Sequence, residues 1–579
     1  MRTGSFSSLS GLSSVASLIL IVGVAACSAQ GSSTVIGNGP TGGSGDPGTD
    51  GQDPTMSTDP TKPAAPAADP SMMGDPTSKD TPSPPLVTGV SITEVAVFQA
   101  VKVPVYAAGK VVAPASRNSP VVANRPGLIR AYVKTDSTYK GGSVTAELRL
   151  VNGTTYLPVI KDTKTISGTS TDADPASTFN FDVPATSLPP GVTYQVLLTQ
   201  TGGVVPTGSS AARLPNDGGV QSLDVMKSGS LKVVIVPVKY NADGSGRTPD
   251  VSAAQLARYK QVFMARYPAE TVDVTARAPW SYSSVVSASG SGFSQVLTAV
   301  TNLRKTDGVA ADVYYYGALA PSSSFNSFCG GGCVTGLSTV VDSPTTAFLR
   351  ASVGIGYTGD DSTNTAAHEV GHAHGRNHAP CGGASGVDPN FPYSGASIGS
   401  WGYDIIAKTF LSPSVGHDMM GYCDNEWVSD YTYTALFDRI AALNGNPVSG
   451  ATGLTAPGSA SFQANVANVA NVEEVAGPGG TFRMATVAED GSVTWTNEIE
   501  LDREPTAGKS LVATFAGANG TTVGTHTAHF YPYDHLPGGV LVVPSAPKPS
   551  SINGFASKAQ LAATWSTVHV AGLANALTR

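Results

Sequence analysis

Four of the nine histidines of this chain fall within eleven residues, in the stretch HEVGHAHGRNH from His368 to His378. On a helix, residues four apart lie on the same face, so His368 and His372 can direct both imidazoles at one metal ion. Glu369 follows the first of them, where its carboxylate can reach a water on that metal without being a ligand. The stretch therefore predicts a helix that carries a metal site.

A third ligand requires this helix to end. A straight helix that rises 1.5 Å per residue would carry His378 about 15 Å from His368. Gly375 provides the end, because glycine adopts the left-handed conformation without steric cost, and the chain can then return His378 to the metal. His374 is rotated about 240° from His368, onto the other face, so we interpret it as a supporting or surface histidine.

The pattern H-E-x-x-H-x-x-G-x-x-H resembles the signature of the metzincin zinc metalloproteases, which is followed by a methionine turn. Downstream, HDMMGYC contains Met420-Gly421-Tyr422, which is similar to the Met-x-Tyr of that family. The resemblance implies an α/β (α+β) peptidase domain over residues 230–447 with one catalytic Zn²⁺. It also implies that Met420, rather than Met419, is the apolar floor below the metal. Tyr422 would stabilise the oxyanion, and a packed tyrosine is the alternative.

Four cysteines lie in the same region: Cys329, Cys333, Cys381 and Cys423. Because the resemblance brings the third ligand and the methionine turn together, it implies a Cys381–Cys423 disulfide. A Cys329–Cys333 disulfide would then close a local loop around GGG. A cysteine zinc site is the alternative, which the glycine spacers and an oxidising location disfavour.

Strand and helix patterns alternate within 230–447, which is typical of an α/β unit. Caps support the predicted helices, with Asp250 or Ser252 before one, and with Ser429 and Asn444-Gly445 at the ends of another. The expected strands cover 231–240, 271–278 and 311–320, and the expected helices cover 252–268, 293–305 and 429–445.

Both neighbouring regions have β patterns. Residues 88–225 contain alternating segments such as GLIRAYVKT and VTYQVLLTQ, which are typical of a β-sandwich, and they include no cysteine or histidine. Residues 450–579 begin with the low-complexity ANVANVANVEEV and continue with alternating strands and an Asp490-Gly491 hairpin signal. We therefore expect a multidomain protein whose α/β unit is flanked by two all-β, sandwich-like domains.

A second group of polar side chains lies in HTAHFYPYDH, near the C-terminus. It comprises His526, His529, Asp534 and His535. Its spacing matches no established ligand rule, and Pro532 interrupts it. We therefore do not expect this group to bind a metal.

The first 27 residues have the pattern of an export signal. The apolar run VASLILIVGVAAC is too short for a comfortable membrane span, and its end resembles a bacterial lipobox. The resemblance implies that Cys27 is lipidated, and an ordinary signal peptide is the alternative. Residues 28–87 are rich in Gly, Pro, Ser and Thr, which predicts a disordered linker. In either case we expect an exported protein, anchored to the bacterial cell envelope by lipid or extracellular.

Charge argues against some partners. Charged residues make up 13% of the chain and the formal net charge is −8, so we expect neither nucleic acid nor, apart from the lipid anchor, a membrane surface as partner. The main hypothesis is an exported zinc endopeptidase of extracellular proteins or glycoproteins, with Glu369 as general base. Alternatives are a surface adhesin or glycan-binding protein with a vestigial peptidase domain, and a zinc amidase that acts on cell-wall peptides.

Overall fold

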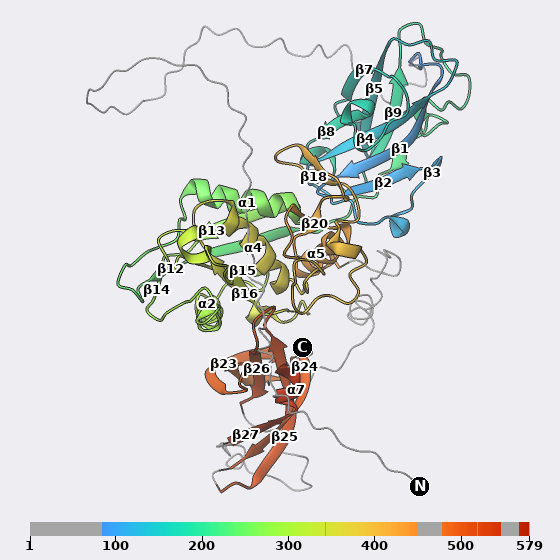
Figure 1. Cartoon of the computed structure of the whole chain (residues 1–579). Coiled ribbons are helices and arrows are strands. Elements are labelled where there is room, and N and C mark those ends of the chain that lie inside the picture. The colour runs from blue at the N-terminus through green and yellow to red at the C-terminus, as the bar shows by residue number, and fades with distance from the viewer. Residues whose placement is uncertain are drawn as a thin grey trace, which may run out of the picture.

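The structure is a computed structural model that describes residues 84–341, 343–447, 478–505, 507–517, 519–545 and 567–577 (Figure 1). The expected signal peptide with Cys27, the linker up to residue 83 and the ANV-rich stretch lie outside the described residues. The described chain is multidomain and mostly β-sheet, with few helices. Among its helices, none is both long and apolar enough to cross a membrane.

The N-terminal domain consists of two sheets, ordered β3-β2-β1-β4-β8 and β10-β9-β5-β6, with β11 on β9 and β7 on β5. Residues alternate along its strands: in β8, Phe179, Phe181 and Val183 are buried and the residues between them are not. This period of two places apolar side chains between the sheets. The strands are β1 Val90–Phe98, β2 Lys102–Ala107, β3 Lys110–Val111, β4 Gly127–Thr135, β5 Ser143–Asn152, β6 Thr155–Tyr156, β7 Ile160–Thr165, β8 Phe179–Val183, β9 Thr193–Thr199, β10 Arg213–Leu214 and β11 Gln221–Ser222.

The central unit is built on a sheet ordered β13-β12-β15-β17-β16, with β14 paired to β12. Four of the five strands in this order run parallel, and β16 is an antiparallel edge strand. The strands are β12 Ser230–Tyr240, β13 Thr271–Ala276, β14 Trp280–Tyr282, β15 Val313–Leu319, β16 Gly336–Ser338 and β17 Ala351–Ile355. Short two-stranded ladders follow: β18 Gly402–Asp404 with β19 Thr409–Leu411, and β20 His417–Asp418 with β21 Glu426–Trp427.

Helices cover both faces of this sheet. On one face, α1 and α4 pack against Val233 and Ile235 of β12, and on the other α2 packs against Val236 and Val238. The helices are α1 Ala253–Arg266, α2 Phe293–Thr306, α3 Phe325–Cys329, α4 Asp360–Ala373 and α5 Asp430–Leu443. Two N-caps lie where the sequence suggests: the Ser252 hydroxyl accepts from the Gln255 N–H, and the Ser429 hydroxyl accepts from the Thr432 N–H.

The described strands of the C-terminal domain form one antiparallel sheet, ordered β23-β22-β26-β25-β24-β27. One face buries Phe482, Met484 and Val542 in a core shared with α2, so this sheet is packed onto the central unit (Figure 1). The elements are β22 Pro478–Val487, β23 Val493–Arg503, β24 Lys509–Ala516, β25 Thr522–Pro532, β26 Gly539–Pro544, β27 Thr567–Ala571 and α7 Leu573–Leu577.

Candidate metal centre

Helix α4 ends where Gly375 turns the chain. Gly375 has φ +88°, and its N–H donates to the His372 carbonyl while the Arg376 N–H donates to the Gly371 carbonyl. These two bonds form a Schellman motif, in which a left-handed residue follows the helix cap. A Cβ on Gly375 would lie 2.6 Å from the Val341 carbonyl oxygen, so a side chain there is excluded by space as well as by conformation.

The turn brings three imidazoles to one point. The Nε2 atom of His372 lies 3.0 Å from Nε2 of His368 and 3.1 Å from Nε2 of His378. His372 and His378 are fully buried. Three ring nitrogens at this separation form a donor set that a single transition-metal ion can bind.

The other nitrogen of each ring faces a backbone carbonyl. Nδ1 of His368 lies 2.7 Å from the Met419 oxygen, Nδ1 of His372 lies 2.6 Å from the Arg376 oxygen, and Nδ1 of His378 lies 2.5 Å from the Ser385 oxygen. A carbonyl can only accept, so each Nδ1 carries the proton and each Nε2 keeps a lone pair. Hydrogen bonds of this kind at Nδ1 orient the imidazoles of metal-binding histidines. The three histidines are therefore suited to bind a metal ion through Nε2.

Burial keeps these imidazoles neutral. It lowers the pKa of His368 and of His372, and it lowers the pKa of His378 to about 3. Neutral imidazole is the form that binds a metal, so the site is prepared for one over the whole neutral range.

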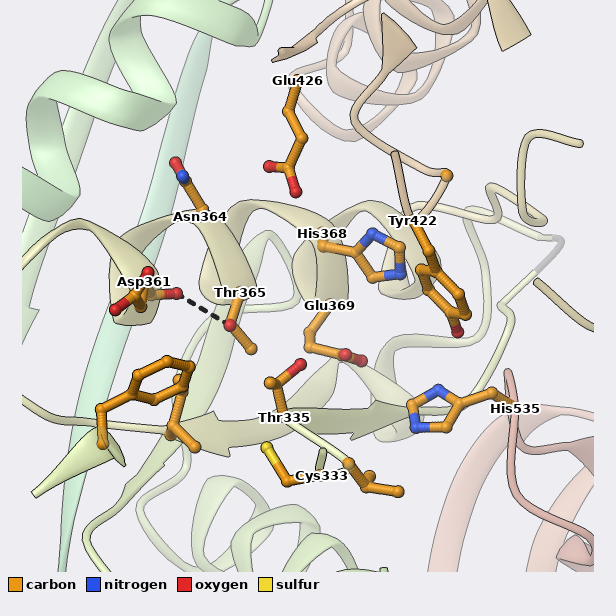
Figure 2. Close-up of a pocket in the computed structure, with 14 residues that line it drawn as sticks. Cys333, Thr335, Asp361, Asn364, Thr365, His368, Glu369, Tyr422, Glu426 and His535 are labelled. Carbon is orange, nitrogen blue, oxygen red and sulfur yellow. Dashed lines mark hydrogen bonds between the residues drawn. The ribbon is translucent and has the colours of Figure 1, made fainter. Parts of the chain in front are cut away.

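Glu369 lies beside His368 at the wall of a pocket (Figure 2). Its side chain is buried, and a Cβ on Gly336 of the edge strand β16 would overlap its carboxylate. Gly336 therefore makes room for Glu369. Burial and the neighbouring Asp534 carboxylate raise the pKa of Glu369 well above its usual value.

The methionine turn lies under the helix. Met420 is buried, and a Cβ on Gly371 of α4 would lie 2.6 Å from its sulfur, so the small residue allows the thioether to approach. Met419 contributes its backbone oxygen to His368 instead. The structure thus places the Met420 side chain, rather than that of Met419, against α4.

Tyr422 follows the same turn, and its hydroxyl lies 2.9 Å from Nε2 of His378. The structure pairs Cys381 with Cys423, which ties the segment after His378 to the segment after Met420. It also pairs Cys329 with Cys333. These are the pairings that the resemblance implies, so the cysteines are not available as zinc ligands.

His374 is a core residue and not a surface one. It is 1% exposed, it stacks on Tyr314 at 4.1 Å between ring centroids, and its Nδ1 lies 2.7 Å from the Val370 carbonyl oxygen. Burial lowers its pKa to about 3. Its ring contacts Tyr267 and Tyr314, and these contacts give it a role in the core.

Asp534 and His535 enter the site from the C-terminal domain, contrary to our expectation for that segment. One carboxylate oxygen, Oδ2 of Asp534, lies 3.4 Å from Nε2 of His372 and accepts at 2.6 Å from Nδ1 of His535. Asp534 forms with the three histidines a group that could hold a metal ion. The sequence contained these residues as a polar cluster, but no spacing rule could indicate that a distant hairpin would bring two of them here.

Comparison with known proteins identifies one family match. The family model Peptidase M66 matches residues 348–436, the stretch with α4, the turn at Gly375 and Tyr422. The match supports a metallopeptidase family. It covers a minor part of the chain, and it coincides with the residues that form the candidate metal centre.

The other comparisons add no functional information. No curated protein matches the chain significantly. Among solved structures, it is similar to a calcium-binding mutant of β-glucuronidase 2 from Bacteroides uniformis, with 10% identity and a TM-score of 0.11. The similarity covers 42% of this chain and 25% of that one, so the chain spans about a quarter of that protein. A likeness at this TM-score carries no argument.

Proposed function

We propose that this chain is an exported zinc metalloendopeptidase with a metzincin-like catalytic domain in residues 230–447. The observation that carries the proposal is the convergence of three Nε2 atoms at 3.0–3.1 Å beside a buried glutamate. The family match over 348–436 supports a peptidase. A zinc ion bound by these rings would polarise the scissile carbonyl and lower the pKa of a water towards 7.

Different protein residues transfer the proton, stabilise the oxyanion and bind the metal. Glu369 accepts the proton of the attacking water and passes it to the departing amine, for which its place beside the rings is suited. The Tyr422 hydroxyl, 2.9 Å from His378 Nε2, donates a hydrogen bond to the developing oxyanion. His368, His372 and His378 hold the metal, and the three carbonyls at their Nδ1 atoms keep the rings oriented.

The substrates that we propose are extracellular proteins or glycoproteins. The edge strand β16 borders the site, since its Gly336 lies against Glu369, and a sheet edge can pair with an extended peptide. The pocket beside Glu369 has apolar and acidic walls. Its lining includes Phe325, Val334, Ile355, Asp361 and Glu426. Lipidation at Cys27 would keep the enzyme at the cell envelope.

The test is a Glu369→Ala exchange, measured by casein cleavage and zinc content. Because Asp534 lies in the site, all compared chains also carry Asp534→Ala. We expect cleavage to fall about 100- to 10,000-fold while zinc stays bound, since Glu369 transfers protons but does not bind the metal. Glu489→Ala, at an exposed glutamate outside the site, is the matched control. Equal cleavage by the Glu369→Ala chain and its control would contradict the proposed mechanism.

A second candidate is a metal-containing surface binding protein without peptidase activity. One observation favours it: Asp534 adds a fourth donor to the three imidazoles, and closed four-donor sites are typical of structural zinc. In that case the Asp534→Ala chain would still bind zinc but would cleave neither casein nor mucin. Digestion of purified peptidoglycan separates both candidates from a cell-wall amidase.

A further inference from the structure

The hairpin tip between β25 and β26, residues 533–538, pairs with the chain that continues from edge strand β16. Thr339 forms an antiparallel bridge with Tyr533, and the Asp534 N–H donates to the Ser338 carbonyl at 3.1 Å. The Val340 N–H donates to the Pro532 carbonyl at 3.3 Å. The tip therefore lies as an added strand on the edge that borders the metal centre.

This pairing points the Asp534 carboxylate into the centre. Its Oδ1 accepts from the Ser338 N–H at 3.1 Å, and its Oδ2 lies 3.4 Å from His372 Nε2. The residue is fully buried. A buried carboxylate is costly unless it is paired or bound to a metal, and carboxylate oxygen is an ordinary zinc ligand.

The position of the carboxylate matters as much as its chemistry. One ligand atom from each of His368, His372, His378 and Asp534 lies within 4.8 Å of the others, and Asp534 forms a second such group with Glu369 and His535. Asp534 thus lies between the imidazoles and the proposed base. Figure 2 shows the Glu369 carboxylate and the Tyr422 hydroxyl directed at the space beside His535. This is the space that an attacking water needs.

Apolar contacts hold the tip in place. Leu536 is partly buried in the core that α2 shares with the C-terminal sheet, and a Cβ on Gly290 would lie 2.9 Å from its Cδ2. Behind it, the rings of Tyr531 and Phe348 pack at 6.0 Å, and the hydroxyls of Thr486 and Thr298 lie 3.0 Å apart. The hairpin is therefore fixed by the interface between the two domains.

We propose that Asp534 is a fourth protein ligand of the metal and that the β25–β26 hairpin tip holds the peptidase site closed. The ligand assignment concerns the metal centre alone, whereas the closed state rests on the proposed function. Withdrawal of the tip frees the fourth position and the edge beside β16 together, because Asp534 occupies the first and also pairs with Ser338 at the second. A substrate chain and the tip therefore compete for one place.

The experiment loads the full-length chain with Co²⁺, whose visible absorption reports its ligands, and compares the parent with Asp534→Ala and Asp534→Asn. The asparagine variant preserves shape and the acceptor for the Ser338 N–H, so it guards against misfolding. Asp490→Ala is the matched control, because Asp490 lies exposed in the turn between β22 and β23 of the same sheet. Azide is the probe for an open position.

We expect both Asp534 variants to change the Co²⁺ spectrum and to bind the metal about tenfold more weakly or worse, since even outer partners of metal ligands affect affinity 10- to 100-fold. Azide should alter the spectrum of the variants and not that of the parent or of Asp490→Ala. Casein cleavage by the zinc-loaded Asp534→Ala chain should exceed that of the parent at least about tenfold, which corresponds to about 1.4 kcal/mol.

The outcomes separate the two proposals. Identical spectra and metal affinities in the parent and both Asp534 variants would overturn the ligand assignment, whatever the peptidase activity. A changed spectrum with equal casein cleavage in the parent and Asp534→Ala would overturn the closed state. A changed spectrum with no cleavage by any chain would leave the ligand in place and reject the peptidase function instead.

Discussion

Two histidine-bearing segments, 368–378 and 526–535, contribute to one site in different ways. In the first, three histidines meet because a helix and one glycine turn fix their relative positions. In the second, only Asp534 and His535 enter the site, carried by a hairpin tip from another domain. His529 remains in its sheet, with Nδ1 3.1 Å from the Ala507 carbonyl oxygen.

The positions of the first group of side chains are fixed by nearby residues, and those of the second group by contacts between two domains. The convergence of the first segment depends on backbone geometry within eleven residues, so we expect its three imidazoles to bind a metal even when the domain interface is changed. The second segment depends on the core that α2 shares with the C-terminal sheet. Loss of a histidine ligand in the first segment should therefore remove the metal. Changes in the second segment should open the site and, at Asp534, also weaken metal binding.

The largest effect is expected on zinc binding, when the exchanges of two histidines of the first segment, His374 and His378, are compared. His378→Ala should weaken zinc binding more than about 100-fold, because a direct ligand is lost. His374→Ala should retain zinc at the parent level, since His374 packs on Tyr314. Zinc titration against a chelating indicator measures both. Loss of zinc in His374→Ala without loss of fold would show that His374 belongs to the centre.

The two disulfides provide a second contrast. Cys381–Cys423 has a sequence separation of 42 and Cys329–Cys333 a separation of 4. In the chain-entropy model, replacing each pair by serines lowers the free energy of unfolding by about 4 and about 2 kcal/mol respectively. Denaturant unfolding tests this order. The reverse order would indicate that the loop around GGG stabilises the fold by contacts rather than by its crosslink.

A comparison of two glycines at helix ends tests the turn that brings His378 to the other two histidines. Gly375 and Gly445 both have positive φ, +88° and +70°, but only Gly375 is surrounded, with Val341 at its side. Gly445→Ala should cost about 1 kcal/mol, the usual penalty for the left-handed conformation. Gly375→Ala should cost more than about 2 kcal/mol and should weaken zinc binding. Thermal melts with and without zinc measure both effects.

Much of the central unit could be predicted because it follows from local rules. Helices α1 and α5 begin at the serines expected as caps, and α5 ends at Asn444. The convergence of His378 with the helix histidines also follows from spacing and Gly375. In the structure, the helix caps and the converging histidines lie at the residues expected from the sequence.

Other features depend on tertiary packing, which spacing does not encode. The edge strand β16 is three residues long and follows a glycine-rich loop, so its sequence lacks the alternation that marks a strand. The burial of His374 requires knowledge that two tyrosines pack beside it. The place of Asp534 requires the domain interface. These are contacts between segments that lie far apart in the chain.

A change in the hairpin tip that spares Asp534 should act on access to the site rather than on metal binding. Leu536→Ala removes an apolar contact of the hairpin tip, which we expect to weaken its docking by about 1–2 kcal/mol. Casein cleavage should then rise about 5- to 30-fold. Leu511→Ala is the matched control, because Leu511 is partly buried on the other face of the same sheet. Equal effects of both exchanges would mean that general loosening, and not release of the tip, raises the rate.

The last effect concerns the pH dependence of stability at a largely buried carboxyl group on α5. Burial raises the pKa of Asp438 on α5 to about 7, and Arg376 only partly offsets this rise. The folded state holds a proton that the unfolded state releases above about pH 4, so stability contributed by this group is lost as pH rises from 4 to 7. Because Asp438 is partly exposed, solvent reduces the effect of its pKa shift on stability. We expect Asp438→Asn to raise the free energy of unfolding by about 1–2 kcal/mol at pH 8 and to leave it unchanged near pH 4. Melting temperatures at both pH values check this. A gain at pH 4 would contradict it.

The most direct test of the metal centre is zinc X-ray absorption on the full-length parent protein. The predicted result is three imidazole nitrogens at about 2.0–2.1 Å and one carboxylate oxygen at about 2.0–2.2 Å, with the oxygen replaced by water in Asp534→Ala. A spectrum with sulfur ligands, or with fewer than three imidazoles, would contradict the site formed by His368, His372 and His378.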